Sequence, residues 1–211
     1  MRLHYSPIKD YLHAVEAVVN YAGLRKRITP VATNPFDPAC DLWKENPLGT
    51  VPTLIVKKGE ALYGGPVIYA FLDTLHRKPK LFGKPGSKQS VQIQRQLWLA
   101  DGVFDTFVRI GREANEPRDT HRPAYVQRNW IKIDRALDDL NHDARTWKGG
   151  LDIAQLRARC SLAFLDRFMA QMATMIDGVD GAYDWRKGRP ALRKWFDKWA
   201  ADPVFTTPLT P

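Results

Sequence analysis

The stretch Asn46-Pro47-Leu48-Gly49-Thr50-Val51-Pro52-Thr53-Leu54-Ile55 decides the fold of this chain. Two prolines and a glycine end any helix before it, and Pro52 stands directly before a β-branched apolar run that predicts a buried strand over residues 53–56. Proline lacks the N–H of a strand ladder and is therefore tolerated only at a strand end or edge. A cis peptide before proline costs only about 0.5–1 kcal/mol. We therefore expect either a cis Val51-Pro52 bond that turns the Val51 backbone toward a ligand, or an ordinary trans proline in a loop.

Length and composition indicate a globular protein with one good core or two small ones, since the chain has 211 residues, 44% hydrophobic and 26% charged. No apolar run approaches the roughly 20 residues of a membrane span, and Met1 to Tyr5 has no features of a signal peptide. We expect a cytoplasmic protein without a membrane partner. The two cysteines, Cys40 and Cys160, form no spaced metal motif, and we expect them as unpaired thiols.

The formal net charge of +9 raises the possibility of a nucleic-acid partner, but its distribution argues against one. Residues 1–80 carry 11 Lys and Arg against 7 Asp and Glu, and the remainder carries 21 against 16. The basic residues are interleaved with acids, and Arg25-Lys26-Arg27 is the only compact triplet. This pattern predicts a mildly basic surface that favours small anionic ligands, and no nucleic-acid binding. The histidines His4, His13 and His76 show no metal spacing, so no metal is expected.

Residues 1–76 predict a small α/β domain in the order βαβαββα. Apolar residues fall at helical spacing up to Ala22, where Gly23 stops the helix, and Pro66 is suited to the first position of a later helix. A βαβ unit followed by an antiparallel hairpin and a helix builds a mixed sheet of thioredoxin-like topology. We expect strands at residues 2–5, 27–31, 53–56 and 60–63, and helices at 10–22, 37–45 and 66–75.

Beyond this domain, residues 77–87 are charged, rich in Pro and Gly, and without period, so they predict a linker. Residues 88–211 then predict an all-α domain. Ser87 can cap a long helix that Pro117 ends, and Asp152 with Gln155 forms a capping box for another. Two further helices are expected, one with apolar residues from 126 to 140 and one from 190 to 199.

The opening motif resembles the cis-proline segment of the cytosolic glutathione transferases, whose architecture is likewise a thioredoxin-like domain, a linker and an all-α domain. The resemblance to a bacterial subgroup extends to Tyr5-Ser6-Pro7, Pro66-Val67-Ile68-Tyr69, Leu99-Ala100-Asp101-Gly102-Val103-Phe104-Asp105, Leu151-Asp152-Ile153-Ala154, Asp184-Trp185-Arg186 and Pro190-Ala191-Leu192. It implies that Val51 and Pro52 bind the cysteinyl part of glutathione as co-substrate, that the Val51-Pro52 bond is cis, and that the protein is a homodimer.

The catalytic position departs from the family pattern. Such enzymes stabilise a glutathione thiolate with a Tyr, Ser or Cys at the end of the first strand or the start of the first helix. Where bacterial relatives usually carry Ser, this chain has Lys9, or Asp10 in the neighbouring alignment. Tyr5 matches the tyrosine of tyrosine-type members. Tyr5 and Lys9 are therefore the catalytic candidates, ahead of Ser6, although an aromatic packing residue and an exposed lysine remain the alternatives.

A second departure lies where the family holds the γ-glutamyl carboxylate with an acid-Ser pair at a helix start. This chain has Gly64-Gly65 there, so only the helix N-terminus and the Gly65 N–H remain to bind it. Each lost polar contact would cost on the order of 1–3 kcal/mol. Either weak glutathione binding or a different ligand is expected.

The resemblance also implies an apolar site for a small hydrophobic electrophile. The residues expected to line this site are Tyr11, Phe104, Phe107, Val108 and Phe205. Arg109 and Arg112, on the same helix as Phe104, could meet an acidic substrate or simply face solvent. Two functions follow: conjugation of glutathione thiolate to the electrophile, or a non-catalytic or altered-ligand protein on the same scaffold. A thiol–disulfide oxidoreductase would need a cysteine near residues 7–10, and this chain has none there.

Overall fold

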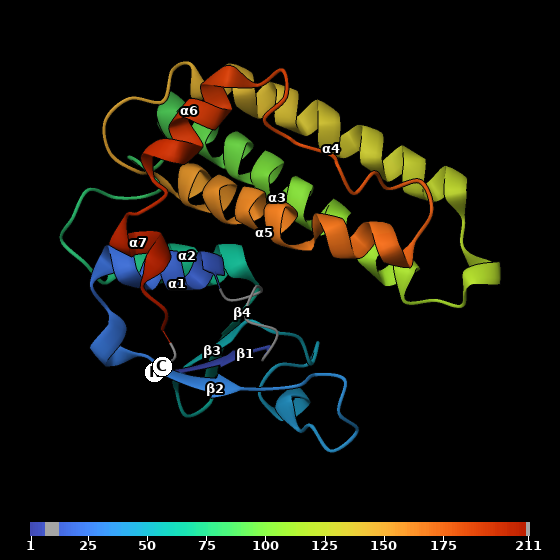
Figure 1. Ribbon diagram of the computed structural model, residues 1–211. Coiled ribbons are helices and arrows are strands. Elements are labelled where there is room, and N and C mark those ends of the chain that lie inside the picture. The colour runs from blue at the N-terminus through green and yellow to red at the C-terminus, as the bar shows by residue number, and fades with distance from the viewer. Residues whose placement is uncertain (7–12, 210–211) are drawn as a thin grey trace. The chain divides into compact units, whose positions relative to one another are not determined.

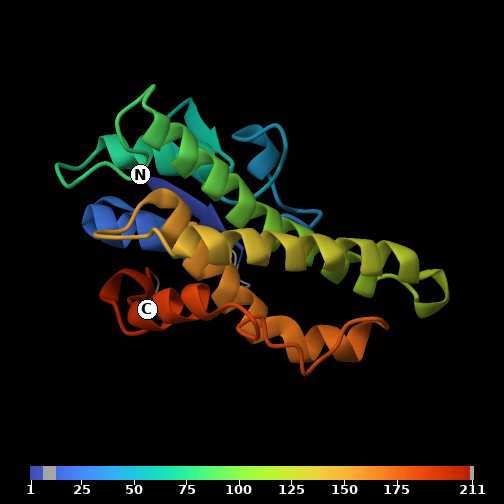
Figure 2. The same ribbon diagram turned by 90° about the horizontal axis from the view of Figure 1, so that it is seen from above.

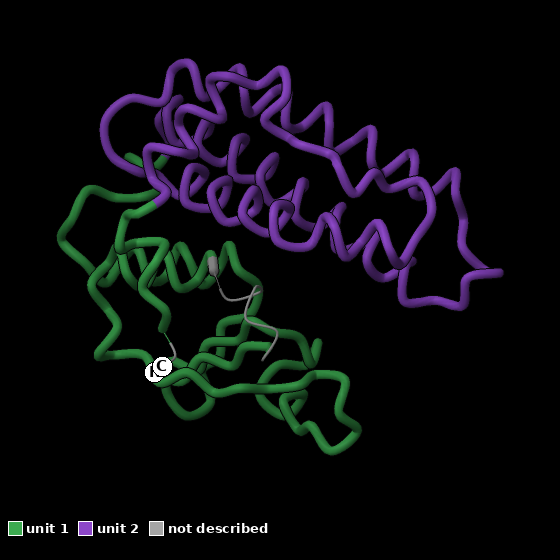
Figure 3. Tube along the Cα trace, in the orientation of Figure 1, with its two compact units in different colours: residues 1–85, 201–211 green, residues 86–200 purple. Residues whose placement is uncertain are grey.

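The computed structural model describes residues 1–6 and 13–209, without the side chain of His13. The chain forms two compact units (Figure 3). The first comprises Met1–Pro85 together with Ala201–Pro211, and the second comprises Gly86–Ala200. The division falls inside the expected linker, and the C-terminal segment differs from the expectation because it joins the first unit.

The first unit is built on a four-stranded mixed sheet in the order β2-β1-β3-β4 (Figure 1). Strand β1 runs parallel to β2 and antiparallel to β3, and β3 pairs antiparallel with β4. In this register Leu3 pairs with Pro30 on one side and with Leu54 on the other. The predicted thioredoxin-like topology is confirmed. The strands are β1 (Arg2–Tyr5), β2 (Thr29–Ala32), β3 (Thr53–Lys57) and β4 (Glu60–Tyr63).

Helices α1 (His13–Ala22) and α2 (Gly65–Thr74) pack against each other in this unit. Their apolar faces are fully buried, as are the sheet residues Leu3 and Leu54. Together these residues form the core of the unit, because burial of apolar surface is the main stabilising term in folding.

The C-terminal segment joins the first unit through α7 (Pro203–Thr206), which packs against α1. The Asn20 amide donates to the carbonyl oxygens of Val204 at 3.1 Å and Thr207 at 2.8 Å. The Leu209 N–H donates to the Glu16 carboxylate at 2.7 Å. These contacts explain why a sequence boundary at residue 76 misses part of the unit.

Two expected elements differ from the structure. The strand expected at 27–31 begins two residues later because Arg25–Arg27 forms a 3-10 turn, η2. The helix expected at 37–45 is wrong except for a single 3-10 turn, η3 (Leu42–Lys44). The Asp37 carboxylate accepts the Ala39 N–H at 2.8 Å, a local turn that competes with a helix.

The second unit is all-helical over its described residues, as predicted (Figure 2). Helix α3 packs against α4 and α5, and α4 also packs against α6. The predicted caps are confirmed: Ser87 accepts the Ser90 N–H at 3.1 Å, and Asp152 accepts the Gln155 N–H at 2.9 Å. No helix within the described residues has the length and apolarity to cross a bilayer. The elements are α3 (Lys88–Ala114), η4 (Arg118–Thr120), α4 (Pro123–Ala144), α5 (Ile153–Met175) and α6 (Pro190–Lys198).

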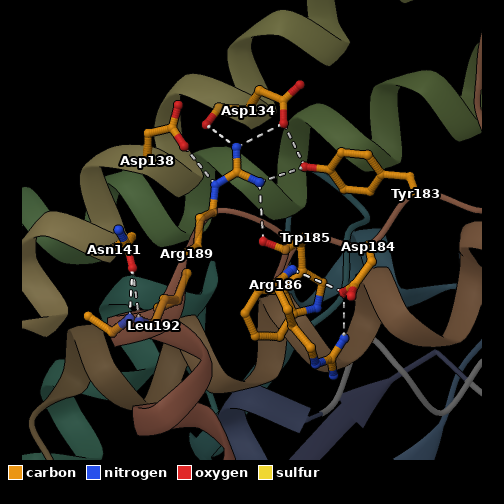
Figure 4. A network of polar contacts seen from close by, with 10 residues as sticks. Asp134, Asp138, Asn141, Tyr183, Asp184, Trp185, Arg186, Arg189 and Leu192 are labelled. Carbon is orange, nitrogen blue, oxygen red and sulfur yellow. Dashed lines mark hydrogen bonds and ion pairs between the residues drawn. The ribbon is translucent and has the colours of Figure 1, made fainter.

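A buried arginine ties the segment before α6 to α4 (Figure 4). The Arg189 guanidinium donates to Asp138 at 2.7 Å and to the Asp134 carboxylate at 3.0 Å. It also donates to the Tyr183 hydroxyl oxygen at 3.2 Å and the Trp185 carbonyl at 3.1 Å. Burial, followed by the hydrogen bond to Asp134, raises the pKa of Tyr183, so that its hydroxyl stays protonated and donates to Asp134. These contacts give the Arg189 guanidinium the hydrogen-bond partners that a buried charge needs, since its side chain is only 8% exposed.

Candidate functional site

The loop of residues 46–52 is held by the buried side chain of Asn46, which is 0% exposed. Its amide nitrogen donates to the Thr50 carbonyl at 3.0 Å and to the Thr53 hydroxyl oxygen at 2.9 Å. Its amide oxygen accepts the Leu48 N–H at 2.9 Å, and the Thr53 hydroxyl donates to the Thr50 carbonyl at 2.7 Å. Buried polar groups require such partners. The Asn46 network therefore fixes the backbone on both sides of Val51.

The Val51-Pro52 peptide bond is cis, which confirms the expectation. In the described part of the chain, no hydrogen bond engages the N–H or the C=O of Val51, which lies before the first residue of β3. The Pro52 carbonyl accepts the Gly64 N–H at 3.4 Å, so this loop is joined to the start of α2. The result is a fixed backbone donor and acceptor beside a helix N-terminus, both without a hydrogen bond to any described residue.

Helix α2 begins at Gly65, after Gly64 with a φ of 84° that favours glycine. The first N–H groups of a helix have no partner within it, and Pro66 supplies none, so the Gly65 N–H is an open donor by position. Side chains four residues apart lie on one helix face. A Cβ atom added to Gly65 would lie 2.6 Å from the hydroxyl oxygen of Tyr69. The Tyr69 hydroxyl therefore occupies the space that a side chain at position 65 would need.

Of the two catalytic candidates, the structure describes only Tyr5. Tyr5 is the last residue of β1, half-buried, and its carbonyl accepts the Thr33 N–H at 2.8 Å. Lys9 lies outside the described residues, as do Asp10 and the expected electrophile-site residue Tyr11.

A histidine adjoins Tyr5 on the same strand. Burial, the largest influence, lowers the pKa of His4, which is therefore neutral at pH 7. Its Nδ1 lies 2.9 Å from the Thr33 hydroxyl oxygen, and its Nε2 lies 3.5 Å from a carboxylate oxygen of Glu45. Glu45 in turn pairs with Arg2 at 2.6 Å. These contacts join β1 to the segment before the Asn46 loop.

The other expected electrophile-site residues lie in different surroundings. Phe104 is 8% exposed and Phe107 is 0% exposed, and their ring centroids lie 4.7 Å and 5.8 Å from that of Phe164. Val108, on the same helix, is half-buried and lines a hollow of about 650 Å³ in the second unit. Phe205 lies in α7 of the first unit. Among the described residues, no group of His, Cys, Asp and Glu side chains could hold a metal ion.

Comparison with solved structures gives agreement over nearly the whole chain. A glutathione S-transferase from Methylobacillus flagellatus kt, with glutathione bound, is 25% identical with a TM-score of 0.81, covering 97% of this chain and 96% of that one. A glutathione transferase family member from Pseudomonas fluorescens Pf-5, also with bound glutathione, is 24% identical with a TM-score of 0.82, covering 100% and 98%. This is the glutathione S-transferase fold.

Two sequence comparisons agree with this fold. Residues 11–75 match the family model described as "Glutathione S-transferase, N-terminal domain". The "Uncharacterized GST-like protein YibF" of Escherichia coli (strain K12) is 26% identical over 124 residues. That match covers 57% of this chain and 61% of the length of the bacterial relative. The matched range of the family model contains the Asn46 loop and the whole of α2.

Two residues of this site were not predicted from the sequence. The motif containing Asn46 was recognised as a whole, but no role was inferred for its amide. Tyr69 belongs to the segment Pro66-Val67-Ile68-Tyr69 that resembles the family, but no contact was inferred for its hydroxyl from the sequence. The signal for Tyr69 was available, since a tyrosine four residues after a helix-initial glycine lies on the same face and points toward the N-terminus.

Proposed function

We propose that this protein binds glutathione at the Asn46 loop and conjugates its thiolate to a small electrophile. The observation that carries the proposal is the open N–H and C=O of Val51, held beside a cis proline by the buried Asn46 amide. An extended peptide ligand can pair with one backbone donor and one acceptor in the manner of an added strand. The cysteinyl residue of glutathione supplies the complementary N–H and C=O.

Tyr69 would supply the carboxylate contact that Gly64-Gly65 lacks. A Ser at position 65 would place its hydroxyl close to Cβ, and the Tyr69 hydroxyl oxygen lies 2.6 Å from that Cβ position. It stands beside the N-terminus of α2, where a negative charge is favoured. We therefore assign the γ-glutamyl carboxylate to the Gly65 N–H and the Tyr69 hydroxyl.

The chemical step requires the bound thiol to lose its proton, because the thiolate is the nucleophile. A hydrogen-bond donor at the sulfur favours the anion, and Tyr5 and Lys9 are the proposed donors. The thiolate sulfur then forms a bond to the electrophilic carbon, and the bond to the leaving group breaks with its electron pair. Tyr11, Phe104, Phe107 and Val108 remain the proposed lining of the electrophile site.

The solved structure from Methylobacillus flagellatus kt supports the proposal, because that relative holds glutathione on the same fold. A homodimer in the cytoplasm is proposed on the family resemblance. The alternative, a binding protein without conjugation, is favoured by one observation: the acid and hydroxyl of the γ-glutamyl site are absent at positions 64 and 65.

Calorimetric titration of the full chain with glutathione, followed by a chlorodinitrobenzene conjugation assay, separates these functions. Binding with turnover supports the transferase. Binding without turnover supports the non-catalytic alternative. The absence of binding at 10 mM glutathione would overturn both, and leave the altered-ligand alternative to be tested with other thiols.

A further inference from the structure

The hollow that contains Val108, a residue that the proposed electrophile site shares, has features of a ligand site that the proposed glutathione contacts do not account for. It lies wholly in the second unit, between the C-terminal half of α3 and the start of α4, and its volume of about 650 Å³ suits a small molecule. Its lining residues are Asp105, Val108, Arg109, Arg112, Glu113, Glu116, Thr120, Arg122 and Tyr125.

Part of the lining of the hollow is an ion pair without net charge. The Glu113 side chain, 4% exposed, accepts the backbone N–H of Arg122 at 2.7 Å and its Nη2 at 2.5 Å. The hydrogen bonds from Arg122 lower the pKa of Glu113, which therefore stays ionised and neutralises that guanidinium. The Arg122 guanidinium also stacks 4.5 Å from the centroid of the Tyr125 ring. This pair shapes the site and leaves no charge for a ligand.

Helix α3, which also carries Glu113, places two further cations at the hollow. Arg109 and Arg112 lie on consecutive turns of α3, both exposed, and both line the hollow. Asp105 and Glu116 stand four residues away from them, the spacing at which helix ion pairs form. In the described part of the chain, neither Arg109 nor Arg112 forms such a pair. Two arginine side chains therefore line the hollow, and Val108, which directly precedes Arg109, lines it beside them.

The charge balance selects the class of ligand. With Glu113 and Arg122 paired, the lining retains two cations and two carboxylates, so it does not attract a polyanion such as nucleic acid. A single carboxylate suits two guanidinium groups, which bind it through charge-assisted hydrogen bonds. The apolar part of such a ligand would lie against Val108 and the ring of Tyr125.

We propose that this hollow binds a small monocarboxylate with an aromatic body, held by Arg109 and Arg112. The inference goes beyond the proposed function and holds whether or not glutathione binds. The test therefore uses the full chain without glutathione, titrated with phenylacetate by calorimetry and by saturation-transfer NMR. Phenylacetamide, which has the same shape without the charge, is the matched ligand.

Phenylacetate should bind at least tenfold more tightly than phenylacetamide, and 0.5 M sodium chloride should weaken it. Arg109→Gln and Arg112→Gln should each weaken binding about tenfold, because each removes a charge-assisted hydrogen bond. Arg128→Gln, which changes an exposed arginine of α4 outside the hollow, should leave binding unchanged.

A second variant protects the test from loss of folding. Asp105→Asn should tighten phenylacetate binding two- to threefold, because it removes a repelling charge, and misfolding cannot produce that gain. Equal binding of the acid and the amide, an unchanged affinity in the Arg109→Gln/Arg112→Gln double variant, or no binding at 10 mM phenylacetate would overturn the proposal.

Discussion

The Asn46 loop and the Arg189 network are each held together by one buried polar side chain, an amide in the first and a guanidinium in the second. In each, one buried side chain makes several hydrogen bonds to backbone and side-chain groups. Asn46 is neutral and holds a loop against itself, whereas Arg189 is charged and joins two elements of the second unit. Because the Asn46 amide is neutral, it holds the loop backbone without adding a charge beside the proposed glutathione site. The difference indicates that the first network serves the proposed site and the second serves stability.

Arg189→Met should have the largest effect on stability. Methionine keeps the apolar stem, but Tyr183 and the Trp185 carbonyl lose a donor, and breaking a buried ion pair is strongly destabilising. We expect the free energy of unfolding in urea to fall by about 3 kcal/mol, with glutathione affinity unchanged in the folded protein. Arg193→Met is the control, since its exposed pair with Asp197 contributes little. Equal losses from both variants would contradict the role of the Arg189 network.

Asn46→Ala should lower the free energy of unfolding less than Arg189→Met does, but it should weaken glutathione binding more. It removes the donor to Thr50 and Thr53 and the acceptor for Leu48, and we expect a loss of about 2 kcal/mol in unfolding free energy. Because the Val51 backbone would lose its support, calorimetry should show at least a tenfold weaker affinity for glutathione. Asn34→Ala, which removes only an exposed turn contact to the Phe36 N–H, is the control. A glutathione affinity equal to that of the wild type would show that Asn46 does not support the proposed site.

A third polar group extends the comparison, because the half-buried Asp152 caps α5 without a cationic partner among the described residues. Burial raises its pKa from 3.8 to about 6. The folded state therefore binds this proton more tightly than the unfolded chain, so its contribution to stability is full below pH 4 and is lost as pH rises through 6.

Asp152→Asn tests this directly, since asparagine also caps helices but does not titrate. Between pH 4 and pH 7 the wild type should lose about 2 kcal/mol of unfolding free energy more than the variant. The measurement is urea unfolding of both proteins across that range. If the unfolding free energies of the wild type and of Asp152→Asn changed with pH in parallel, Asp152 would ionise in the folded state as it does in the unfolded chain.

Tyr69→Phe should have the smallest effect, a moderate loss of glutathione affinity. Loss of one hydroxyl contact should weaken glutathione about five- to tenfold, while the dipeptide Cys-Gly, which lacks the γ-glutamyl group, should bind equally to both proteins. Gly65→Ser alone should be destabilising because its Cβ meets the Tyr69 ring. Gly65→Ser combined with Tyr69→Leu should recover glutathione affinity. Equal weakening of both ligands by Tyr69→Phe would contradict the carboxylate assignment.

The sequence was sufficient for most of the fold, and the reasons are physical. Proline and glycine positions located the hairpin and the start of α2 within one residue, and the Asp152 cap was predicted from local spacing. The docking of α7 onto α1 could not be predicted, because it depends on Asn20 and Glu16 meeting residues nearly two hundred positions away. The helix expected at 37–45 failed because the Asp37 side-chain bond outweighs helix propensity there.

The candidate site was predicted in outline through the cis proline, but its support was not. The Asn46 amide contacts lie within seven residues, yet a sequence pattern does not show whether an asparagine is buried. The hollow beside Val108 depends on where α4 begins relative to α3, which no local pattern specifies.

The most direct test of the central claim is the amide signal of Val51 in a ¹H–¹⁵N correlation spectrum of the full chain during a glutathione titration. We expect a downfield shift of the Val51 amide proton as its N–H gains an acceptor, saturating at the concentration that calorimetry gives for binding. An unchanged Val51 signal at saturating glutathione would contradict it.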